Sequence, residues 1–278
     1  MKTKFVLIIF TTLLFFSANS LLARGALLHN DIDAYSFTFL RLFSGATVLV
    51  VLLYVKERKI SLHVNKNWLS SFMLFLYAIS FSYAYINLNA GVGALILFAV
   101  VQLTLIVLAF FHKEKISIQK LIGLAIAFAG LVYLLYPREN FDLSFVHTLL
   151  MILSGFAWGI YTILGKNSTN ATLHTADNFL KSILYLVIFF FLFVSSIHAD
   201  TKGIVLALFS GGITSALGYV LWYYILPKIS VMTSGALQLL VPPIAIFLSV
   251  FLLGESLSAT LVISTVVILG GIFITIKK

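Results

Sequence analysis

The sequence predicts an all-α integral membrane protein with ten transmembrane helices, arranged as two inverted five-helix repeats. Three observations predict this fold class. Residues of the Ala, Val, Ile, Leu, Met, Phe, Trp, Tyr and Cys set make up 61% of the 278 residues, whereas Asp, Glu, Lys and Arg make up 10%. The apolar residues form runs long enough to cross a bilayer, and the second half of the chain repeats features of the first.

The composition also excludes several classes of protein. A soluble domain carries about a quarter charged residues, so this chain has too few to cover its surface, and the remainder must face lipid. Cysteine is absent, which excludes disulfides and thiolate metal sites. The net charge of +9 would suit a nucleic-acid partner, but the basic residues lie in short segments between apolar runs. We expect a lipid bilayer as the partner, no nucleic acid, no metal and no cofactor.

Ten apolar runs have the length that a bilayer requires, since a hydrocarbon core about 30 Å thick needs roughly 20 residues of helix. They are residues 5–22, 34–55, 68–88, 90–111, 116–136, 144–165, 179–197, 203–226, 229–253 and 257–276. The first run follows Lys2 and Lys4 and has features of a signal peptide. We interpret it as an uncleaved first helix, because its apolar stretch continues through Leu22 and the first repeat needs it.

Two interruptions in this pattern are informative. The third and fourth runs meet at residues 87–91, which leaves room only for a tight turn. The ninth run contains Pro242 and Pro243, which remove backbone donors and must bend or break a helix. We therefore assign these two prolines to a helix break with a role in gating.

The distribution of Lys and Arg predicts the orientation. If the N-terminus is cytoplasmic, nearly all basic residues fall on the cytoplasmic side, and only Arg24, Arg138 and Lys202 on the other, with Arg41 inside the second run. Positive charge is retained on the cytoplasmic side of membranes. The sequence therefore predicts a multi-pass protein of the bacterial inner membrane with both termini in the cytoplasm.

An internal repeat appears when the chain is compared with itself at an offset of about 140 residues. Residues 39–41 (Phe-Leu-Arg) match residues 179–181 (Phe-Leu-Lys), and residues 93–95 match residues 235–237 (both Gly-Ala-Leu). We predict repeats at 1–138 and 139–278. Because five is odd, the second repeat enters the membrane from the opposite face, and substrate sites of such proteins lie near the midplane between the halves.

Further motifs carry a resemblance to a known family. The ninth run reads Gln-Leu-Leu-Val-Pro-Pro over residues 238–243 and leads to Leu-Gly-Glu at residues 253–255, and the tenth has a Gly pair at residues 270–271. With the paired five-helix units, these features resemble the drug/metabolite transporter superfamily, EamA-type, over essentially the whole chain. The resemblance implies export of amino acids, other metabolites or drug-like compounds.

The first repeat departs from the family pattern. Val101 and Gln102 stand where the second repeat has prolines, and His-Lys-Glu at residues 112–114 replaces Leu-Gly-Glu. We therefore expect the fourth helix to be straighter than the ninth. Glu114 and Glu255 end equivalent helices, and we expect them to act structurally or as gate partners.

Arg41 lies about two turns inside the second predicted span, where a charged side chain is costly unless it has a partner. A guanidinium binds carboxylate or phosphate in a bidentate manner, so Arg41 is a candidate for substrate binding. The alternative is that Arg41 forms an ion pair with a loop carboxylate such as Asp31 or Asp33, or caps carbonyl groups of a neighbouring helix. Lys181, its counterpart in the second repeat, is expected to snorkel to the membrane surface.

Amides and aromatic side chains complete the candidate site. Amides offer both donors and acceptors to a polar substrate, and aromatic rings stack on apolar or cationic groups. Alternatively, the amides form hydrogen bonds between helices, and the aromatic rings lie in a belt at the membrane interface. An amide at the start of the seventh run, Asn178, is expected to cap its helix. Our candidate substrate-binding residues are Asn19, Arg41, Tyr85, Gln102, Trp158, Tyr161 and Gln238.

All nine acidic residues are expected in loops or at helix ends, so no carboxylate is predicted mid-membrane to carry protons or bind cations. The six histidines lie near span ends without metal-ligand spacing, which argues against an intramembrane enzyme. We therefore predict a secondary transporter, not an enzyme, that exports amino acids or related compounds through a central cavity. The alternatives are a transporter of organic cations, drug-like or phosphorylated solutes and, more remotely, an intramembrane enzyme or a lipid-handling protein. A monomer is expected to suffice, with a dimer as the alternative.

Overall fold

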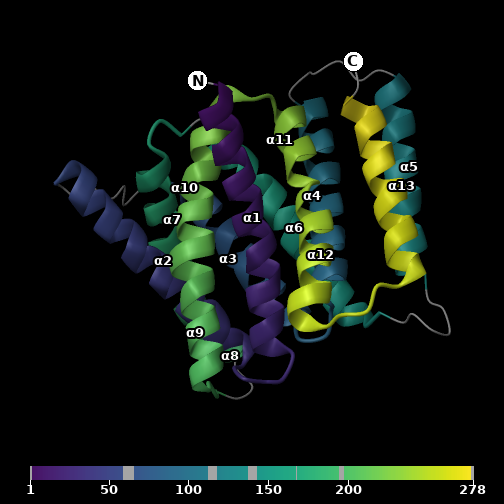
Figure 1. Ribbon diagram of the computed structural model, residues 1–278. Helices are drawn as coiled ribbons and strands as arrows, with labels where there is room; N and C mark the ends of the chain where they lie inside the picture. The colour runs from purple at the N-terminus through teal and green to yellow at the C-terminus, as the bar shows by residue number, and fades with distance from the viewer. Residues whose placement is uncertain are drawn as a thin grey trace.

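The computed structural model describes residues 2–58, 66–111, 118–136, 143–166, 168–193 and 197–276. These residues are almost entirely helical and form a bundle in which most helices run between the same two faces (Figure 1). Helix α1 begins and helix α13 ends on one face, which we call the termini side; the other is the opposite side. The predicted boundary between the repeats, residues 138 and 139, lies outside the described residues.

Ten membrane-spanning units make up the described part of the chain. The first five are α1 (Lys2–Leu27), α2 (Ala34–Glu57), α3 (Trp68–Ala84), α4 (Ala90–Phe111) and α5 (Ile118–Leu135). The other five are α6 (Phe145–Gly165); α7 (Ala171–Ile188) with the short α8 (Phe190–Phe193); α9 (Thr201–Phe209) with α10 (Ala216–Ile225); α11 (Val231–Gln238) with α12 (Val241–Leu253); and α13 (Ala259–Ile276). The predicted all-α membrane fold is confirmed.

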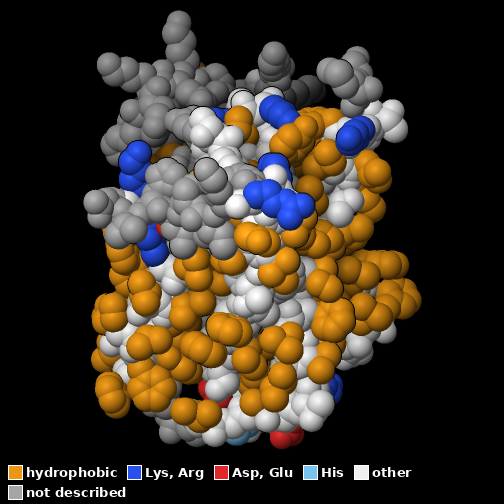
Figure 2. Space-filling model, turned by 90° about the vertical axis from the view of Figure 1, so that its left-hand side faces the viewer, with side chains coloured by type: hydrophobic (Ala, Val, Ile, Leu, Met, Phe, Trp, Pro, Cys, Tyr) orange, Lys and Arg blue, Asp and Glu red, His pale blue; other side chains and the backbone are white. Residues whose placement is uncertain are grey.

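The surface agrees with burial in lipid. Within the described residues, six helical segments are long and apolar enough to cross a membrane by length and composition, and three shorter helices are also apolar. Figure 2 shows hydrophobic side chains over the middle and lower parts of one face, with Lys and Arg near its upper edge. Helices α5 and α13 pack along each other at one edge of the bundle (Figure 1).

The seventh span begins earlier than predicted, at Ala171 instead of Phe179. The Asn170 side chain caps it by accepting a hydrogen bond from the Leu173 amide (3.0 Å). Asn178 therefore lies inside the helix, and the prediction that it caps the helix was wrong. Hydropathy missed residues 171–178 because they are rich in polar side chains. In the bundle, most of these polar side chains are buried between helices.

The ninth span is broken at Leu239 and Leu240, two to three residues before the first of its prolines. Helix α11 ends at Gln238, and α12 begins at Val241 with Pro242 and Pro243 in its first turn. Proline is tolerated there because the first turn of a helix needs no backbone donors. Helix α4, its counterpart, is continuous through Gln102. A role of this break in gating stays a prediction.

The eighth span contains a π-helical turn, Ser210–Ser215, that brings its backbone against α2. A Cβ atom added at Gly211 would collide with the carbonyl oxygen of Arg41, which belongs to the backbone and cannot move independently. Glycine is therefore required at this crossing, where small residues allow close helix approach.

We expect Gly211→Ala to destabilise the protein by about 1–3 kcal/mol, the usual cost of overpacking. The measurement is the thermal unfolding midpoint of the purified variant in detergent. Gly270→Ala is the matched control, because no atom lies within 4 Å of a Cβ added there. Equal midpoints for the two variants would contradict the proposed close packing of Gly211 on Arg41.

Candidate functional site

A small cavity lies in the middle of the bundle, between helices of both repeats. Its volume is about 10 Å³, roughly what one water molecule needs. The central region is therefore closed in this structure, and a metabolite requires the helices to separate. The lining side chains come from α1, α3, α4, α6 and α10, and six of the nine are aromatic: Phe16, Asn19, Ser20, Tyr77, Phe81, Leu97, Phe98, Trp158 and Tyr219.

Arg41 lies directly behind this aromatic lining, with only 1% of its surface exposed. Its Nη2 donates to the hydroxyl oxygens of Tyr77 and Tyr219, each at 3.0 Å, and its Nε donates to the Ser215 hydroxyl at 3.0 Å. The guanidinium also lies 4.8 Å from the centre of the Phe81 ring, a cation–π contact. The second repeat thus supplies two of the three hydrogen-bond acceptors.

No acidic side chain neutralises Arg41 within the described part of the chain. Asp31 pairs with Lys202 (2.6 Å), and Asp33 caps α2 through the Ser36 amide (2.8 Å). The alternative interpretation of Arg41 as the partner of these carboxylates was therefore wrong. Among the described residues its Nη1 has no hydrogen-bond partner, so a buried charged donor is left for another group.

Asn19 lines the cavity and is held by the eighth span. Its carboxamide oxygen accepts hydrogen bonds from the hydroxyls of Ser210 (2.9 Å), Thr214 (2.7 Å) and Ser215 (3.1 Å). Ser215 also accepts from Arg41, so one hydroxyl links the amide to the guanidinium. This orientation leaves the amide nitrogen as the polar atom that Asn19 offers to a ligand.

Trp158 also lines the cavity, and Gln238 holds it in place. The indole Nε1 donates to the Gln238 carboxamide oxygen at 2.7 Å, and Gln238 Nε2 donates to the Ser234 carbonyl. The indole ring contacts the rings of Phe16, Tyr77 and Tyr219 with centroids 4.8–5.5 Å apart. Gln238 lies at the last residue of α11, so a movement of the broken ninth span would reach the cavity through Trp158.

The remaining predicted residues lie around the cavity without lining it. Tyr161 packs against Trp158 with ring centroids 5.4 Å apart. Tyr85 packs edge-on against Phe81 at 4.7 Å. Gln102 is 1% exposed, and within the described part of the chain neither polar atom of its amide group has a hydrogen-bond partner. Its contact is the backbone of Gly235 in α11, where an added side chain would collide with it.

The candidates drawn from the sequence do not include Tyr77 and Tyr219, because hydropathy does not distinguish an aromatic side chain in a cavity from one in an interfacial belt. Tyr77 and Phe81 are four residues apart, so they share a helix face, and that spacing was the available signal. The sequence offers no signal that this face meets Tyr219.

On the opposite side, an ion pair closes the bundle across the two repeats. Arg24 Nε lies 3.5 Å from Glu255 Oε1, and both side chains are more than nine-tenths buried. Both carboxylate oxygens of Glu255 accept from the Ala90 amide at 2.9 Å, at the N-terminus of α4. The expected role of Glu255 as a structural or gate partner is consistent with this position. Its counterpart Glu114 lies outside the described residues.

Arg24 also fixes the turn between α3 and α4. Its Nη1 donates to the carbonyl oxygens of Tyr85 (3.1 Å) and Ile86 (2.9 Å). The Tyr85 hydroxyl in turn donates to the Ala90 carbonyl at 3.3 Å. The Tyr85 ring also contacts Phe81, which lines the cavity. The ion pair and the cavity are therefore connected through Tyr85, whose backbone binds Arg24.

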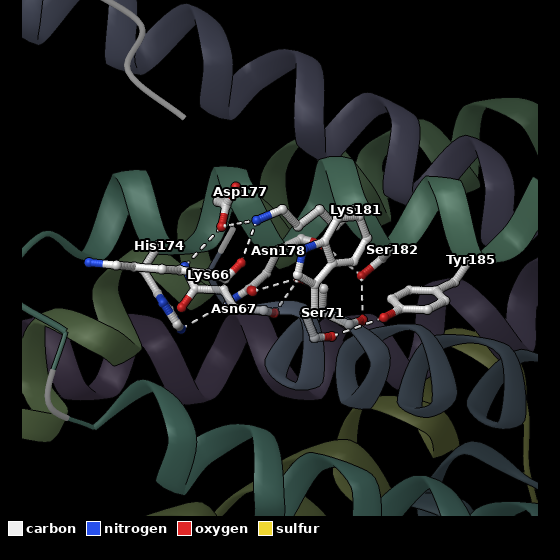
Figure 3. Close-up of polar contacts among 10 residues, drawn as sticks. Lys66, Asn67, Ser71, His174, Asp177, Asn178, Lys181, Ser182 and Tyr185 are labelled. Carbon is white, nitrogen blue, oxygen red and sulfur yellow. Dashed lines mark hydrogen bonds and ion pairs between the residues drawn. The ribbon is translucent and has the colours of Figure 1, made fainter. Parts of the chain in front are cut away.

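On the termini side, an ion pair within α7 is hydrogen-bonded to the residues that precede α3 (Figure 3). Asp177 Oδ2 accepts from Asn67 Nδ2 and from Lys181 Nζ, both at 2.8 Å. Lys181 also donates to the Lys66 carbonyl. Asp177 is 2% exposed and lies inside α7, so the expectation that every acidic residue falls in a loop or at a helix end was wrong. Lys181 is buried and paired, which contradicts its predicted snorkelling.

Amide and hydroxyl groups extend the same contact (Figure 3). The Ser71 hydroxyl donates to Asn178 Oδ1 at 2.9 Å, and the Ser182 hydroxyl donates to the Ser71 carbonyl at 2.8 Å. The Asn178 amide nitrogen lies 2.9 Å from His174 Nε2. Polar contacts between the repeats therefore close the bundle on both sides of the cavity. No cluster of three potential metal-ligating side chains occurs among the described residues.

Two closures on either side of a central polar and aromatic cavity, in a bundle of two five-helix units, define a membrane transporter. The chain belongs to the EamA-like transporter family, which matches residues 3–136 and again residues 147–277. This result confirms the resemblance stated from the sequence.

Individual relatives agree with this assignment. The chain is 40% identical over 260 residues to an uncharacterized protein of Pseudomonas aeruginosa, covering 94% of this chain and 90% of the relative. It is 24% identical to a probable amino-acid metabolite efflux pump of Salmonella typhimurium, covering 84% and 85% of the two chains. A solved crystal structure matches with a TM-score of 0.73 at 19% identity, covering 98% of this chain and 97% of the other. That likeness shows the fold alone.

Proposed function

We propose that this protein is a secondary transporter of the bacterial inner membrane that exports amino acids or related small metabolites. The observation that carries the proposal is the buried, unneutralised guanidinium of Arg41 beside an aromatic cavity between the repeats. A carboxylate supplies the missing negative charge, and aromatic rings accommodate an apolar side chain. The Salmonella relative, named as a probable amino-acid metabolite efflux pump, supports this substrate class.

The orientation with both termini in the cytoplasm belongs to the same proposal. It rests on the positive-inside distribution of Lys and Arg. In this orientation the hydrogen bonds from Asp177 and Lys181 to the residues that precede α3 form the cytoplasmic closure, and the Arg24–Glu255 pair forms the external one. Both repeats lie in one chain, so a monomer contains the complete cavity.

A phosphorylated solute is the second candidate, because phosphate also binds a guanidinium in a bidentate manner. Organic cations are disfavoured as substrates, because the residues that line the cavity include no acidic side chain and the positive charge of Arg41 lies behind them.

Proteoliposome flux of radiolabelled solutes tests the proposal. We expect purified protein to accelerate exchange of at least one amino acid over protein-free vesicles, and to leave organic cations and sugar phosphates unchanged. A panel of the common amino acids without accelerated exchange under any imposed gradient would reject the amino-acid assignment. Accelerated exchange of a sugar phosphate alone would establish the second candidate.

A further inference from the structure

We propose that the hydroxyl groups of Tyr77 and Tyr219 form the carboxylate receptor of the central cavity, and that Arg41 acts through them. This inference rests on the proposed function and refines its substrate class: the transported molecule must carry a carboxylate, whereas its ammonium group is dispensable. Arg41 is then a positioning residue, and the two tyrosines are the binding residues.

The arrangement of donors supports this assignment. Tyr77 and Tyr219 both line the cavity, whereas Arg41 lies behind them. Each tyrosine oxygen accepts a hydrogen bond from the same Arg41 nitrogen, Nη2, at 3.0 Å. A shared donor holds the two hydroxyl groups as a pair, with one on α3 of the first repeat and the other on α10 of the second.

A hydroxyl that accepts from a cation becomes a stronger donor. The guanidinium draws electron density from the phenol oxygen, and hydrogen bonds in such a chain strengthen one another in a medium of low dielectric constant. The oxygen of each tyrosine accepts from Arg41, and the Tyr77 and Tyr219 side chains also hydrogen-bond to each other, so the pair retains one polarised hydroxyl hydrogen for a ligand. This donor suits one oxygen of a carboxylate, and the amide nitrogen of Asn19 suits the other.

The rest of the lining strengthens the preference for an anion. The Asn19 oxygen already accepts three hydroxyls, so its amide contributes a further donor. The indole nitrogen of Trp158 is occupied by Gln238. Among the lining residues, no acidic side chain is present to accept from an ammonium group. The cavity therefore offers a ligand hydrogen-bond donors, and the positive charge of Arg41 lies behind these donors.

The test compares three probes of one size: leucine, 4-methylpentanoate, which lacks the ammonium group, and leucinamide, which lacks the carboxylate. Initial rates of flux are measured in proteoliposomes containing the full chain. We expect leucine and 4-methylpentanoate to be transported and leucinamide to show a KM at least about tenfold higher, since hydrogen bonds to a charged group contribute this much or more.

The variants are Tyr77→Phe and Tyr219→Phe, which keep the rings and remove the hydroxyls. Each is expected to raise the KM for leucine and 4-methylpentanoate about tenfold or more, with Vmax retained and the KM for leucinamide unchanged. Tyr35→Phe is the matched control, because its hydroxyl is also buried and hydrogen-bonded (to the Leu186 carbonyl, 3.1 Å) but does not line the cavity. Thermal unfolding midpoints identify any variant that has lost its fold.

The outcomes separate the two proposals. If leucine is transported and both tyrosine variants keep the wild-type preference for leucine over leucinamide, the receptor is wrong and the transport function stands. If 4-methylpentanoate alone is transported and the tyrosine variants raise its KM, the receptor stands and the amino-acid assignment fails. Transport of leucinamide alone, or of none of the probes, counts against both.

Discussion

Arg41→Ala is expected to lower the rate of substrate flux by about 100-fold or more. The change removes three hydrogen bonds, to Tyr77, Tyr219 and Ser215, and the positive charge that polarises the two tyrosines. Without this support, the hydrogen bonds that the site gives to a substrate carboxylate are weakened; bonds to a charged group contribute about 1.5–3 kcal/mol each, so the loss of two exceeds a factor of 100. The measurement is initial flux in proteoliposomes, supported by cellular resistance to toxic amino-acid analogues.

Arg41→Lys is the informative companion variant. An ammonium group keeps the charge but lacks the planar fork that reaches both tyrosines, so we expect partial activity between that of wild type and Arg41→Ala. The unfolding midpoint must be measured for each variant, because both leave buried oxygens without a donor. Wild-type resistance and flux in Arg41→Ala would remove Arg41 from the site.

Glu255→Ala is expected to open the bundle on the side opposite the termini. Removing one member of a buried ion pair leaves an uncompensated charge and costs about 3–5 kcal/mol. Here the unpaired group is Arg24, and the N-terminus of α4 at Ala90 also loses its acceptor. In an open arrangement water reaches Arg24. The unpaired charge and the lost acceptor therefore destabilise the closed arrangement more than the open one.

Thiol labelling measures this opening directly, since the chain contains no cysteine. Ser20→Cys places one thiol in the lining of the cavity. We expect a membrane-impermeant maleimide, added from the side of Glu255, to react at least about tenfold faster in Ser20→Cys/Glu255→Ala than in Ser20→Cys alone, which corresponds to about 1.4 kcal/mol.

Glu255→Gln is the matched control. Its side-chain oxygen can still accept a hydrogen bond from the Ala90 amide, but the negative charge that pairs with Arg24 is lost. The double variant Arg24→Ala/Glu255→Ala should be less destabilised than the sum of its single changes, since coupled residues are not additive. An unchanged labelling rate combined with a lower unfolding midpoint would mean that the pair stabilises the fold and does not gate the cavity.

The number of spans and the class of fold followed from the sequence because partition into a bilayer is a local property. Each apolar run must satisfy its own backbone hydrogen bonds, so its length and hydropathy are sufficient evidence for a helix. The seventh span shows the limit of this reasoning. Residues 171–178 are too polar to be recognised as membrane helix, yet Asp177 and Asn178 are buried there because α3 supplies Asn67 and Ser71 as partners.

The ninth span shows a different relation between sequence and structure. Pro242 and Pro243 predict an interruption because proline lacks a backbone donor. Where the helix stops is decided by the turn at Leu239 and Leu240, and the prolines begin the next helix instead of bending the first. Gln238, the last residue of α11, then holds Trp158 at the cavity.

The candidate site depended most on tertiary structure. From the sequence, Arg41 was compatible with substrate binding, with a pair to Asp31 or Asp33, and with capping of a neighbouring helix, because the two aspartates lie within ten residues of it. Packing decided between these alternatives: the two aspartates bind other partners, and Arg41 meets Tyr219, which is 178 residues away in the chain. Side-chain pairs at such separations depend on how the repeats pack, and no local pattern reports them.

Hydropathy, charge distribution and the internal repeat were therefore sufficient to identify a ten-helix membrane protein of two related halves. These properties are summed over many residues, so they tolerate errors at single positions. The closed state of the cavity, the pairing of its tyrosines and the ion pairs on either side were decided by tertiary packing alone. Each depends on a few atoms from distant segments, positioned to within a hydrogen-bond length.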